Sequence, residues 1–343
     1  MSRYRHALVV GKFAPLHVGH QQLLDHAHAV ADEVTVVVWS NPDFEDMPND
    51  VRADWVRALY PNALVLVGHD GPPNDAPDAV QRHYTAALLA RHGRVPDVAT
   101  TCEPYGPGLA AHLGIAHEWA GPARPSDGPS GTRLRADIHA HRHLLHPTVY
   151  AHFVERVVLM GAESTGKSTL AERLADDFQT EYVREYGREH YEARGGQLDL
   201  DDYVTIARLH REREDSAVAR TNRFLFIDTN AITTMFFSHY YNRDSLPELR
   251  RLADECATRY RHVIVCDDDI PFEQDGWRDN VVWRGRMQGM VLHDLATRRI
   301  PFQVVHGSLN ERGDQVRTIL TGRQAAAPRT IKSLGPRPFE MPR

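Results

Sequence analysis

Twice along the chain, a short apolar segment runs directly into a glycine loop that opens a helical pattern. The first instance starts at residues 7–10, passes through a loop at 11–19 and continues into helical spacing at 21–31. A β-branched run at 34–39 follows it. The second instance starts at residues 156–160 and leads through another glycine loop into helical spacing at 168–178. Strand–loop–helix units of this kind form parallel sheets with crossover helices, so we predict an α/β fold in each half.

The repeated start also predicts the domain organisation. A chain of 343 residues is long enough for two domains of about 100–200 residues each. We place the boundary near Tyr150, which gives domains at 1–150 and 151–325. Residues 326–343 are rich in Pro and Arg and carry no periodic pattern, so we expect them to be disordered.

Composition excludes several classes of protein. Hydrophobic residues make up 42% and the formal net charge is −6, which disfavours a nucleic-acid-binding protein. Cys102, Cys256 and Cys266 are scattered without C-x-x-C spacing, which is typical of reduced thiols. No signal peptide pattern or membrane-length apolar run is present. We therefore expect a cytoplasmic protein with small-molecule substrates and no membrane insertion, and a homo-oligomer is compatible with the sequence.

The loop at residues 161–168 fits the P-loop pattern G-x-x-x-x-G-K-[ST] at every fixed position. In such a loop the backbone N–H groups surround a phosphate, Lys167 reaches the β- and γ-phosphates, and Ser168 binds Mg²⁺. The alternative is an ordinary glycine-rich turn. We predict ATP as co-substrate and Mg²⁺ as cofactor, with ATP contacts from Gly161, Glu163, Ser164, Thr165, Gly166, Lys167, Ser168 and Thr169.

Two acidic residues are candidates for the chemistry at this loop. Asp228 ends the apolar run 224–227, where a Walker-B aspartate would hold Mg²⁺; a helix cap is the alternative. Glu185 follows the segment where a second strand should end. We prefer Glu185 over Asp228 to orient or deprotonate a substrate hydroxyl, although a solvated salt bridge gives the same pattern.

Charged residues also follow the apolar run at 262–266. Three aspartates at 267–269 would lie at the carboxyl end of a strand, which suits a polar, sugar-like substrate. We expect Asp275 and Arg278 to contact the substrate, since arginines beyond this strand suit a lid over the transferring phosphate. A charged surface loop is the alternative.

The first loop, Gly-Lys-Phe-Ala-Pro-Leu-His-Val-Gly-His at 11–20, resembles the G-x-F-x-P-x-H-x-G-H loop of the nucleotidyltransferase superfamily. The resemblance implies that His17 and His20 donate hydrogen bonds to ATP phosphates, and that catalysis relies on positioning and charge neutralisation. A metal pair or two surface histidines are the alternatives. Further ATP contacts are implied for Gly11, Lys12, Phe13 and Gly19.

A second segment of the N-terminal half supports this interpretation. Residues 130–135, Ser-Gly-Thr-Arg-Leu-Arg, resemble the S-x-T-x-x-R motif of the same superfamily, in which both hydroxyls and the arginine hold the β- and γ-phosphates. That role would fall to Ser130, Thr132 and Arg135, although Ser130 could simply cap a helix. Together the motifs imply a Rossmann-like nucleotidyltransferase domain followed by a P-loop kinase domain.

This domain order resembles the NadR family, which pairs nicotinamide mononucleotide (NMN) adenylyltransferase with ribosylnicotinamide kinase. The resemblance rests on residues 11–20, 130–135, 161–168, 185–188, 228–229 and 271–278, with Phe272 where the family tends to have Trp. It implies that one domain makes NMN from the riboside and the other makes NAD. Trp39 and Trp55 are candidates to stack on the pyridine ring, with burial in a core as the alternative.

Some members of that family begin with a helix-turn-helix domain and repress transcription. Here the first strand is predicted at about Ala7, so we do not expect a repressor role. The nearest rival is a coenzyme A synthase, in which phosphopantetheine adenylyltransferase is fused to dephospho-coenzyme A kinase. A nucleotide-sensing regulator with one active domain is a second rival, although intact His17, His20, Lys167 and Ser168 argue against a lost activity.

Overall fold

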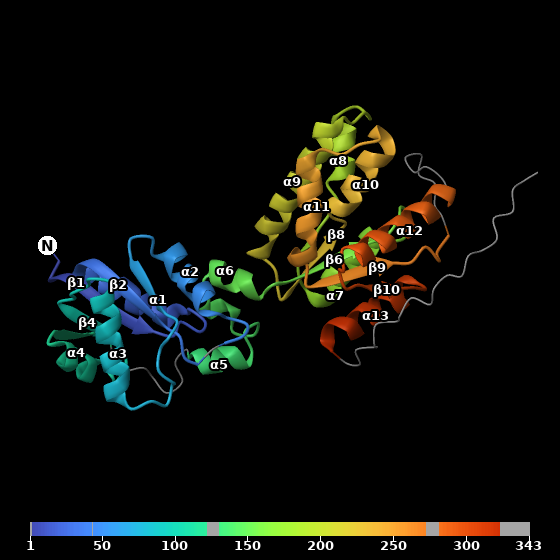
Figure 1. Ribbon diagram of the computed structural model, residues 1–343. Helices are drawn as coiled ribbons and strands as arrows, with labels where there is room; N and C mark the ends of the chain where they lie inside the picture. The colour runs from blue at the N-terminus through green and yellow to red at the C-terminus, as the bar shows by residue number, and fades with distance from the viewer. Residues whose placement is uncertain (1, 43, 122–129, 272–280, 323–343) are drawn as a thin grey trace, which may run out of the picture. The chain divides into compact units, whose positions relative to one another are not determined.

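The computed structural model describes residues 2–42, 44–121, 130–271 and 281–322. It divides into two compact units, Met1–Phe153 and Val154–Arg343, which are the blue-to-green and green-to-red parts of Figure 1. A domain boundary is predicted near Tyr150, and the predicted tail at 326–343 lies outside the described residues.

Unit 1 is built on a five-stranded parallel sheet with the strand order β3-β2-β1-β4-β5. The strands are β1 (Tyr4–Gly11), β2 (Ala31–Trp39), β3 (Leu64–Gly68), β4 (Val98–Thr101) and β5 (Ala116–Trp119). The helices are α1 (Val18–Val30), α2 (Asn49–Leu59), α3 (Asp78–Arg91), α4 (Gly106–Leu113), α5 (Gly131–Ala136) and α6 (Pro147–Tyr150).

The strand order of unit 1 determines where a ligand can bind. The chain runs outward from β1 through β2 to β3, and then continues on the other side of β1 with β4 and β5. In open α/β sheets, ligands bind outside the carboxyl ends of the strands at such a reversal. One face of the sheet is closed by Leu88, Leu89 and Leu109 from α3 and α4, which pack on Leu8 and Val37. The loop after β1 therefore lies at the expected position for a site.

Unit 2 contains a second five-stranded parallel sheet, with the order β10-β9-β6-β8-β7. The strands are β6 (Glu155–Met160), β7 (Tyr182–Val183), β8 (Phe224–Asp228), β9 (His262–Cys266) and β10 (Gln303–Val305). The helices are α7 (Lys167–Phe178), α8 (Gly187–Ala193), α9 (Leu200–Val218), α10 (Ala231–Asn242), α11 (Pro247–Arg259), α12 (Val281–Thr297) and α13 (Leu309–Thr321).

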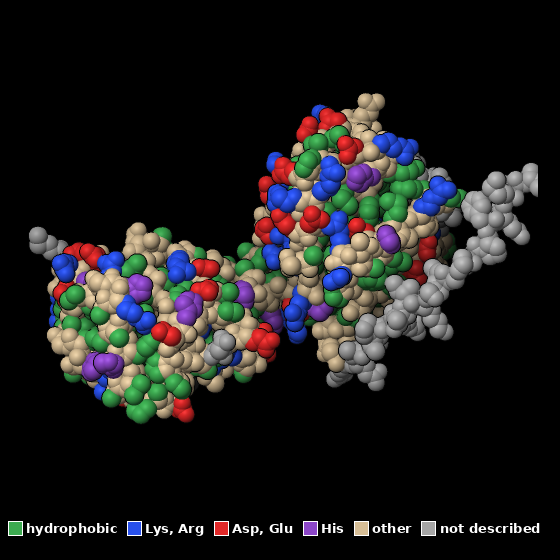
Figure 2. Space-filling view, in the orientation of Figure 1, with side chains coloured by type: hydrophobic (Ala, Val, Ile, Leu, Met, Phe, Trp, Pro, Cys, Tyr) green, Lys and Arg blue, Asp and Glu red, His purple; other side chains and the backbone are tan. Residues whose placement is uncertain are grey.

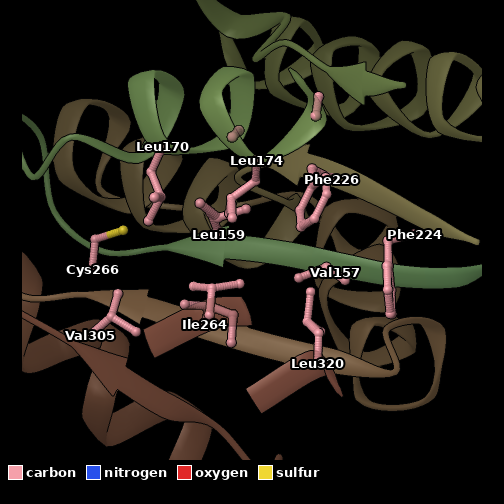
Figure 3. Packing of buried hydrophobic residues seen from close by; sticks show 13 residues of the cluster. Val157, Leu159, Leu170, Leu174, Phe224, Phe226, Ile264, Cys266, Val305 and Leu320 are labelled. Atoms are coloured by element: carbon pink, nitrogen blue, oxygen red, sulfur yellow. The ribbon is translucent and has the colours of Figure 1, made fainter. Parts of the chain in front are cut away.

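The core of unit 2 explains why β6 is apolar from Val157 to Met160. Figure 3 shows Val157 and Leu159 on one face of β6, packed against Leu170 and Leu174 of α7. Leu320 of α13 closes the same face. The helices α9, α10 and α11 lie on the opposite side of the sheet (Figure 1). A strand that is covered on both faces needs apolar residues at nearly every position, as parallel sheets commonly do.

The structure confirms an α/β architecture with parallel sheets, and several element boundaries differ from the prediction. The helix predicted at 21–31 begins at Val18, because the His17 side chain caps it, and Ala31 already belongs to β2. The two-residue strand β7 is too short to give a period-2 signal.

The helices, the cysteines and the surface charges can each be compared with the expectations from composition. Within the described ranges, none of the helices is long and apolar enough to cross a membrane. Cys102, Cys256 and Cys266 are free thiols. On the face that Figure 2 shows, basic and acidic side chains are interspersed over each unit.

Candidate active sites

The histidine loop of unit 1 is held by hydrogen bonds at the start of α1. Nδ1 of His17 accepts a hydrogen bond from the N–H of Gly19 at 3.1 Å. Nδ1 of His20 faces the N–H of His17 at 3.4 Å, and the two imidazole rings lie 4.0 Å apart. A neutral imidazole that accepts at Nδ1 carries its proton on Nε2. Each ring therefore has the tautomer whose Nε2–H can donate to a phosphate.

Arg135 joins the second motif to the histidine loop, although they are far apart in the sequence. Its Nη1 donates to the carbonyl oxygen of Ala14, 121 positions away, at 2.5 Å, and its Nη2 donates to Oγ1 of Thr132 at 3.1 Å. A Cβ atom on Gly131 would lie 2.7 Å from that same Ala14 oxygen. Only glycine allows this approach without displacement of the loop. Ser130 caps α5 by accepting from the N–H of Arg133 at 3.1 Å.

A cavity of about 1190 Å³ opens between these two motifs. It is larger than most sites for one small molecule, which hold about 300–1,000 Å³, so a nucleotide and a second substrate fit together. Nine of the residues singled out from the sequence line it: Gly11, Lys12, His17, Gly19, His20, Trp39, Ser130, Thr132 and Arg135. The structure thus brings together both predicted motifs of unit 1.

Two of the candidate residues of unit 1 lie away from this cavity. The side chain of Phe13 is fully buried and lies with its ring 5.0 Å from that of His20. Trp55 is 5% exposed and packs against Phe153. Both rings are surrounded by protein, so we expect them to act through packing. Trp39 is the one of the two candidate tryptophans that borders the cavity.

Lys12 and Arg135 form a basic part of the cavity wall, although Asp78 and Glu103 also line the cavity. Burial lowers the pKa of Lys12, and the positive charges of Arg135 and Arg52 lower it further, against the opposing effect of Glu103. Burial also lowers the pKa of Arg135. Cations crowded in this way are stabilised by an anion between them. The wall therefore suits a ligand with several phosphate groups.

Arg52 was not singled out from the sequence, yet it holds the loop in place. Its guanidinium is fully buried and donates to the carbonyl oxygens of Lys12 at 2.5 Å, Trp39 at 2.9 Å and Met47 at 2.9 Å. An arginine in an amphipathic helix usually faces solvent, and no local sequence pattern marks this one as buried. Only the fold shows that α2 directs it toward the ends of β1 and β2.

In unit 2 the predicted P-loop connects β6 to α7, as its motif requires. Gly161 has φ 133° and Gly166 has φ 78°, values that favour glycine. Nζ of Lys167 donates to the carbonyl oxygen of Ala162 at 2.7 Å, and Oγ1 of Thr165 donates to the same oxygen at 2.8 Å. The side chains of Thr165 and Lys167 thus converge on one carbonyl oxygen near the start of the loop.

Ser168 and Asp228 form an oxygen-rich pair beside the loop. Oγ of Ser168 donates to Oδ2 of Asp228 at 2.5 Å. Asp228 is 1% exposed, and its Oδ1 has no hydrogen-bond partner within the described part of the chain. A buried carboxylate oxygen without a partner is costly unless a further group binds it. Hard oxygen ligands of this kind are those that Mg²⁺ prefers, so the pair fits the predicted metal.

Glu185 lies just beyond β7 and faces the same pair. Burial of its carboxyl group raises the pKa to about 7, and repulsion from Asp228 adds to the effect against the attraction of Lys167. A carboxylate with a pKa near the working pH is suited to general base catalysis. Its electrostatic interactions with Lys167 and Asp228 indicate that the three candidate catalytic residues of unit 2 lie near one another.

Two further polar residues of this site were not found from the sequence. His210 on α9 is buried near Asp228, and burial lowers its pKa to about 4. Gln288 on α12 accepts from the N–H of Ala162 at 2.9 Å. Neither stands in a recognisable motif. The predicted substrate contacts Asp275 and Arg278 lie outside the described residues.

The fold and the two sites define a two-unit α/β protein with a P-loop in unit 2. Residues 156–312 match the family model described as an AAA domain. The chain is 30% identical over 320 residues to the trifunctional NAD biosynthesis/regulator protein NadR of Escherichia coli K12. The matched region covers 86% of this chain and 77% of that protein. NadR of Salmonella typhimurium LT2 is also 30% identical, over 318 residues. The chain belongs to the NadR family.

Solved structures of NadR proteins show the same fold. One, in complex with NAD and AMP-PNP, superposes with a TM-score of 0.68 at 21% identity and covers 95% of this chain and 99% of that chain. Another, in complex with NR, has a TM-score of 0.68 at 20% identity, covering 95% of this chain and 98% of that one. At these identities the likeness concerns the fold.

Proposed function

We propose that the chain is a bifunctional enzyme of NAD salvage. Unit 2 transfers the γ-phosphoryl group of ATP to nicotinamide riboside and forms NMN. Unit 1, which we assign to the Rossmann-like nucleotidyltransferases, joins NMN to the adenylyl group of ATP and forms NAD and pyrophosphate. The observation that carries the proposal is that each unit of this NadR-family chain has its own phosphate-binding loop with its charged partners in place.

In unit 2 the reaction needs a base, an electrophile and neutralisation of charge. Glu185 accepts the proton of the riboside hydroxyl while that oxygen attacks the γ-phosphorus, and the bond to the β-bridging oxygen breaks to release ADP. A pKa of about 7 keeps part of Glu185 deprotonated at neutral pH. Lys167 then turns from the Ala162 carbonyl toward the β- and γ-phosphates.

Mg²⁺ would be held by Ser168 and Asp228. When bound, it would neutralise the charge that develops on the phosphate oxygens. The position of Asp228 at the end of β8, one strand away from the P-loop strand β6, is the position that Walker-B aspartates occupy.

In unit 1 the phosphate of NMN is itself the nucleophile, so no protein base is required. One of its oxygens attacks the α-phosphorus of ATP, and the α–β bridging bond breaks to release pyrophosphate. His17 and His20 donate from Nε2 to the phosphates, and Arg135 neutralises the leaving group. Their contribution is positioning and electrostatic stabilisation. Trp39, which borders the same cavity, is our candidate to contact the pyridine ring.

The two reactions are consecutive, because the product of unit 2 is the substrate of unit 1. Relatives in the NadR family carry the words NAD biosynthesis in their names, and structures of NadR proteins hold NAD and NR, which supports the nicotinamide substrates over pantetheine ones.

Both reactions use ATP, and free thiols persist in a reducing compartment. We therefore place the enzyme in the cytoplasm.

The proposal is tested by supplying the purified protein with Mg-ATP and one acceptor at a time. The acceptors are nicotinamide riboside, NMN, phosphopantetheine and dephospho-coenzyme A, and product formation is followed by chromatography. We expect ADP and NMN from the riboside, and pyrophosphate and NAD from NMN. Turnover of the pantetheine compounds without turnover of either nicotinamide compound would overturn the assignment.

A further inference from the structure

A buried arginine outside the P-loop motif is bonded to the P-loop backbone. Arg312 lies in the first turns of α13 and is 2% exposed. Its Nη1 donates to the carbonyl oxygen of Thr165 at 2.5 Å. Thr165 is itself fully buried in the middle of the loop. The contact joins residues that are 147 positions apart in the chain.

The same guanidinium also binds the two segments that flank the loop. Nη2 donates to the carbonyl oxygen of Asp267 at 3.0 Å and is ion-paired with the carboxylate of Asp269. Nε donates to the carbonyl oxygen of Gly307 at 2.8 Å. Asp269 in turn accepts from the N–H of Gly307 at 2.6 Å. Arg312 thus connects the P-loop, the segment after β9 and the loop before α13.

The planarity of the peptide group gives the contact with Thr165 its consequence. In a trans peptide the C=O and the following N–H point in opposite directions. Because the Thr165 oxygen is directed at Arg312, the N–H of Gly166 is directed away from Arg312. P-loops bind phosphate through such N–H groups.

We propose that Arg312 is a positioning residue for ATP in unit 2, which acts by setting the direction of the Thr165–Gly166 peptide without touching the nucleotide. The kinetic test of this role rests on the kinase function proposed above, because it measures the riboside kinase reaction. The close approach of Arg312 to the loop supports it, since a Cβ atom on Gly166 would lie 3.7 Å from Nη1.

Arginine is suited to this role in a way that lysine is not. The guanidinium offers five donors in a rigid planar fork, whereas an ammonium is a single compact charge. Here Nε, Nη1 and Nη2 each have an acceptor on a different segment. A lysine could reach one or two of these acceptors, so Arg312→Lys should retain part of the effect.

The test compares Arg312→Met and Arg312→Lys with the parent protein in the riboside kinase reaction. Misplacement of a binding group by about 1 Å costs roughly 100-fold, so for Arg312→Met we expect kcat/KM for ATP to fall about 10- to 100-fold. KM for ATP should rise, KM for the riboside should stay unchanged, and Arg312→Lys should be intermediate. A merely structural role would lower kcat in proportion to the active fraction and leave KM for ATP unchanged, which would overturn the proposal.

Two control variants test whether the effect comes from the loss of any arginine on α13 or from an unpaired carboxylate. Arg317→Met removes another ion-paired arginine of α13, which binds Asp314 and Asp177 at the surface, and should leave KM for ATP unchanged. The double variant Arg312→Met with Asp269→Asn leaves no unpaired carboxylate, and should show the same rise in KM for ATP. Circular dichroism reports the folding of each variant, and adenylyl transfer by unit 1 reports the amount of protein in every sample.

A binding measurement separates this proposal from the proposed function. AMP-PNP is titrated calorimetrically into the parent protein and into Arg312→Met. The same titration of Lys167→Ala measures the binding of AMP-PNP to unit 1, and this contribution is subtracted. Weaker binding by Arg312→Met supports the positioning role even if the riboside proves not to be the substrate. Equal affinity for AMP-PNP and equal KM for ATP would overturn the role while leaving the proposed function intact.

Discussion

The hydroxyl of Ser168 lies 2.5 Å from Oδ2 of Asp228, and this contact joins the P-loop to the end of β8. The other oxygen of Asp228 is buried without a partner within the described residues. The pair therefore has the composition of a candidate cation site.

Replacement of Asp228 by Asn should abolish most of the riboside kinase activity. The neutral amide keeps the shape of the side chain but loses the charge that binds Mg²⁺, and metal assistance contributes several kcal/mol to such reactions. We expect a fall of about 100-fold or more in kcat and a higher Mg²⁺ requirement in a magnesium titration. Adenylyl transfer in the same sample serves as the control, and unchanged magnesium dependence would contradict the assignment.

The kinase activity should depend on pH through Glu185. The base acts when deprotonated, and its pKa is raised to about 7, so kcat/KM for the riboside should rise with pH through about 7 and fall away below it. Glu185→Gln should remove this limb together with most of the activity. Initial rates between pH 5.5 and 9 provide the measurement. A limb that persists in Glu185→Gln would assign it to another group.

The two activities should be separable by single substitutions. Lys167→Ala removes the side chain at the β- and γ-phosphates of unit 2, so riboside phosphorylation should be lost while NMN adenylylation continues. His20→Ala should have the reverse effect, because its ring belongs to the cavity of unit 1. Both rates are measured on the same preparations. Loss of both activities from either folded variant would contradict the two-site picture.

Gly131→Ala should damage adenylyl transfer specifically. The added Cβ atom would lie 2.7 Å from the oxygen of Ala14, so α5 and the histidine loop must separate and the Arg135 contact must lengthen. Misplacement of this kind costs roughly 10- to 100-fold in kcat/KM. Gly289→Ala is the matched control, since a Cβ atom there meets nothing within 4 Å. Equal adenylylation rates in the two variants would show that the close approach is not required.

Arg52→Met should destabilise unit 1. It leaves three buried carbonyl oxygens without their donor, and unsatisfied buried groups cost about 1–3 kcal/mol each. We expect the unfolding free energy to fall by roughly 3 kcal/mol in urea denaturation followed by circular dichroism. Arg57→Met on the same helix removes only an exposed pair with Asp54 and should change stability by less than about 0.5 kcal/mol. Similar losses in both variants would contradict a special role for Arg52.

Much of the P-loop site could be predicted from the sequence, because its residues lie close together along the chain. The lysine and serine of residues 161–168 follow the glycines in a fixed spacing, and an apolar strand with a terminal aspartate predicted Asp228. The place of Glu185 after an expected strand predicts its role, and in the structure it interacts electrostatically with Asp228 and Lys167.

Residues that act through long-range contacts were not accessible in this way. Arg52, Gln288 and Arg312 stand in ordinary helical surroundings in the sequence, where an arginine or glutamine is most often solvated. Each is buried and bonded to the backbone of one of the two candidate phosphate-binding loops. No spacing rule connects residue 312 with residue 165.

The sequence by itself determined the two loops, the parallel α/β architecture and the family, because backbone conformation and phosphate binding impose fixed residues at short spacing. Tertiary structure alone decided which of the candidate rings face a cavity, which arginines hold the loops, and that Arg135 reaches Ala14. Those outcomes depend on burial and on the direction of hydrogen bonds between distant segments. Such properties arise only when the sheets and helices are packed together.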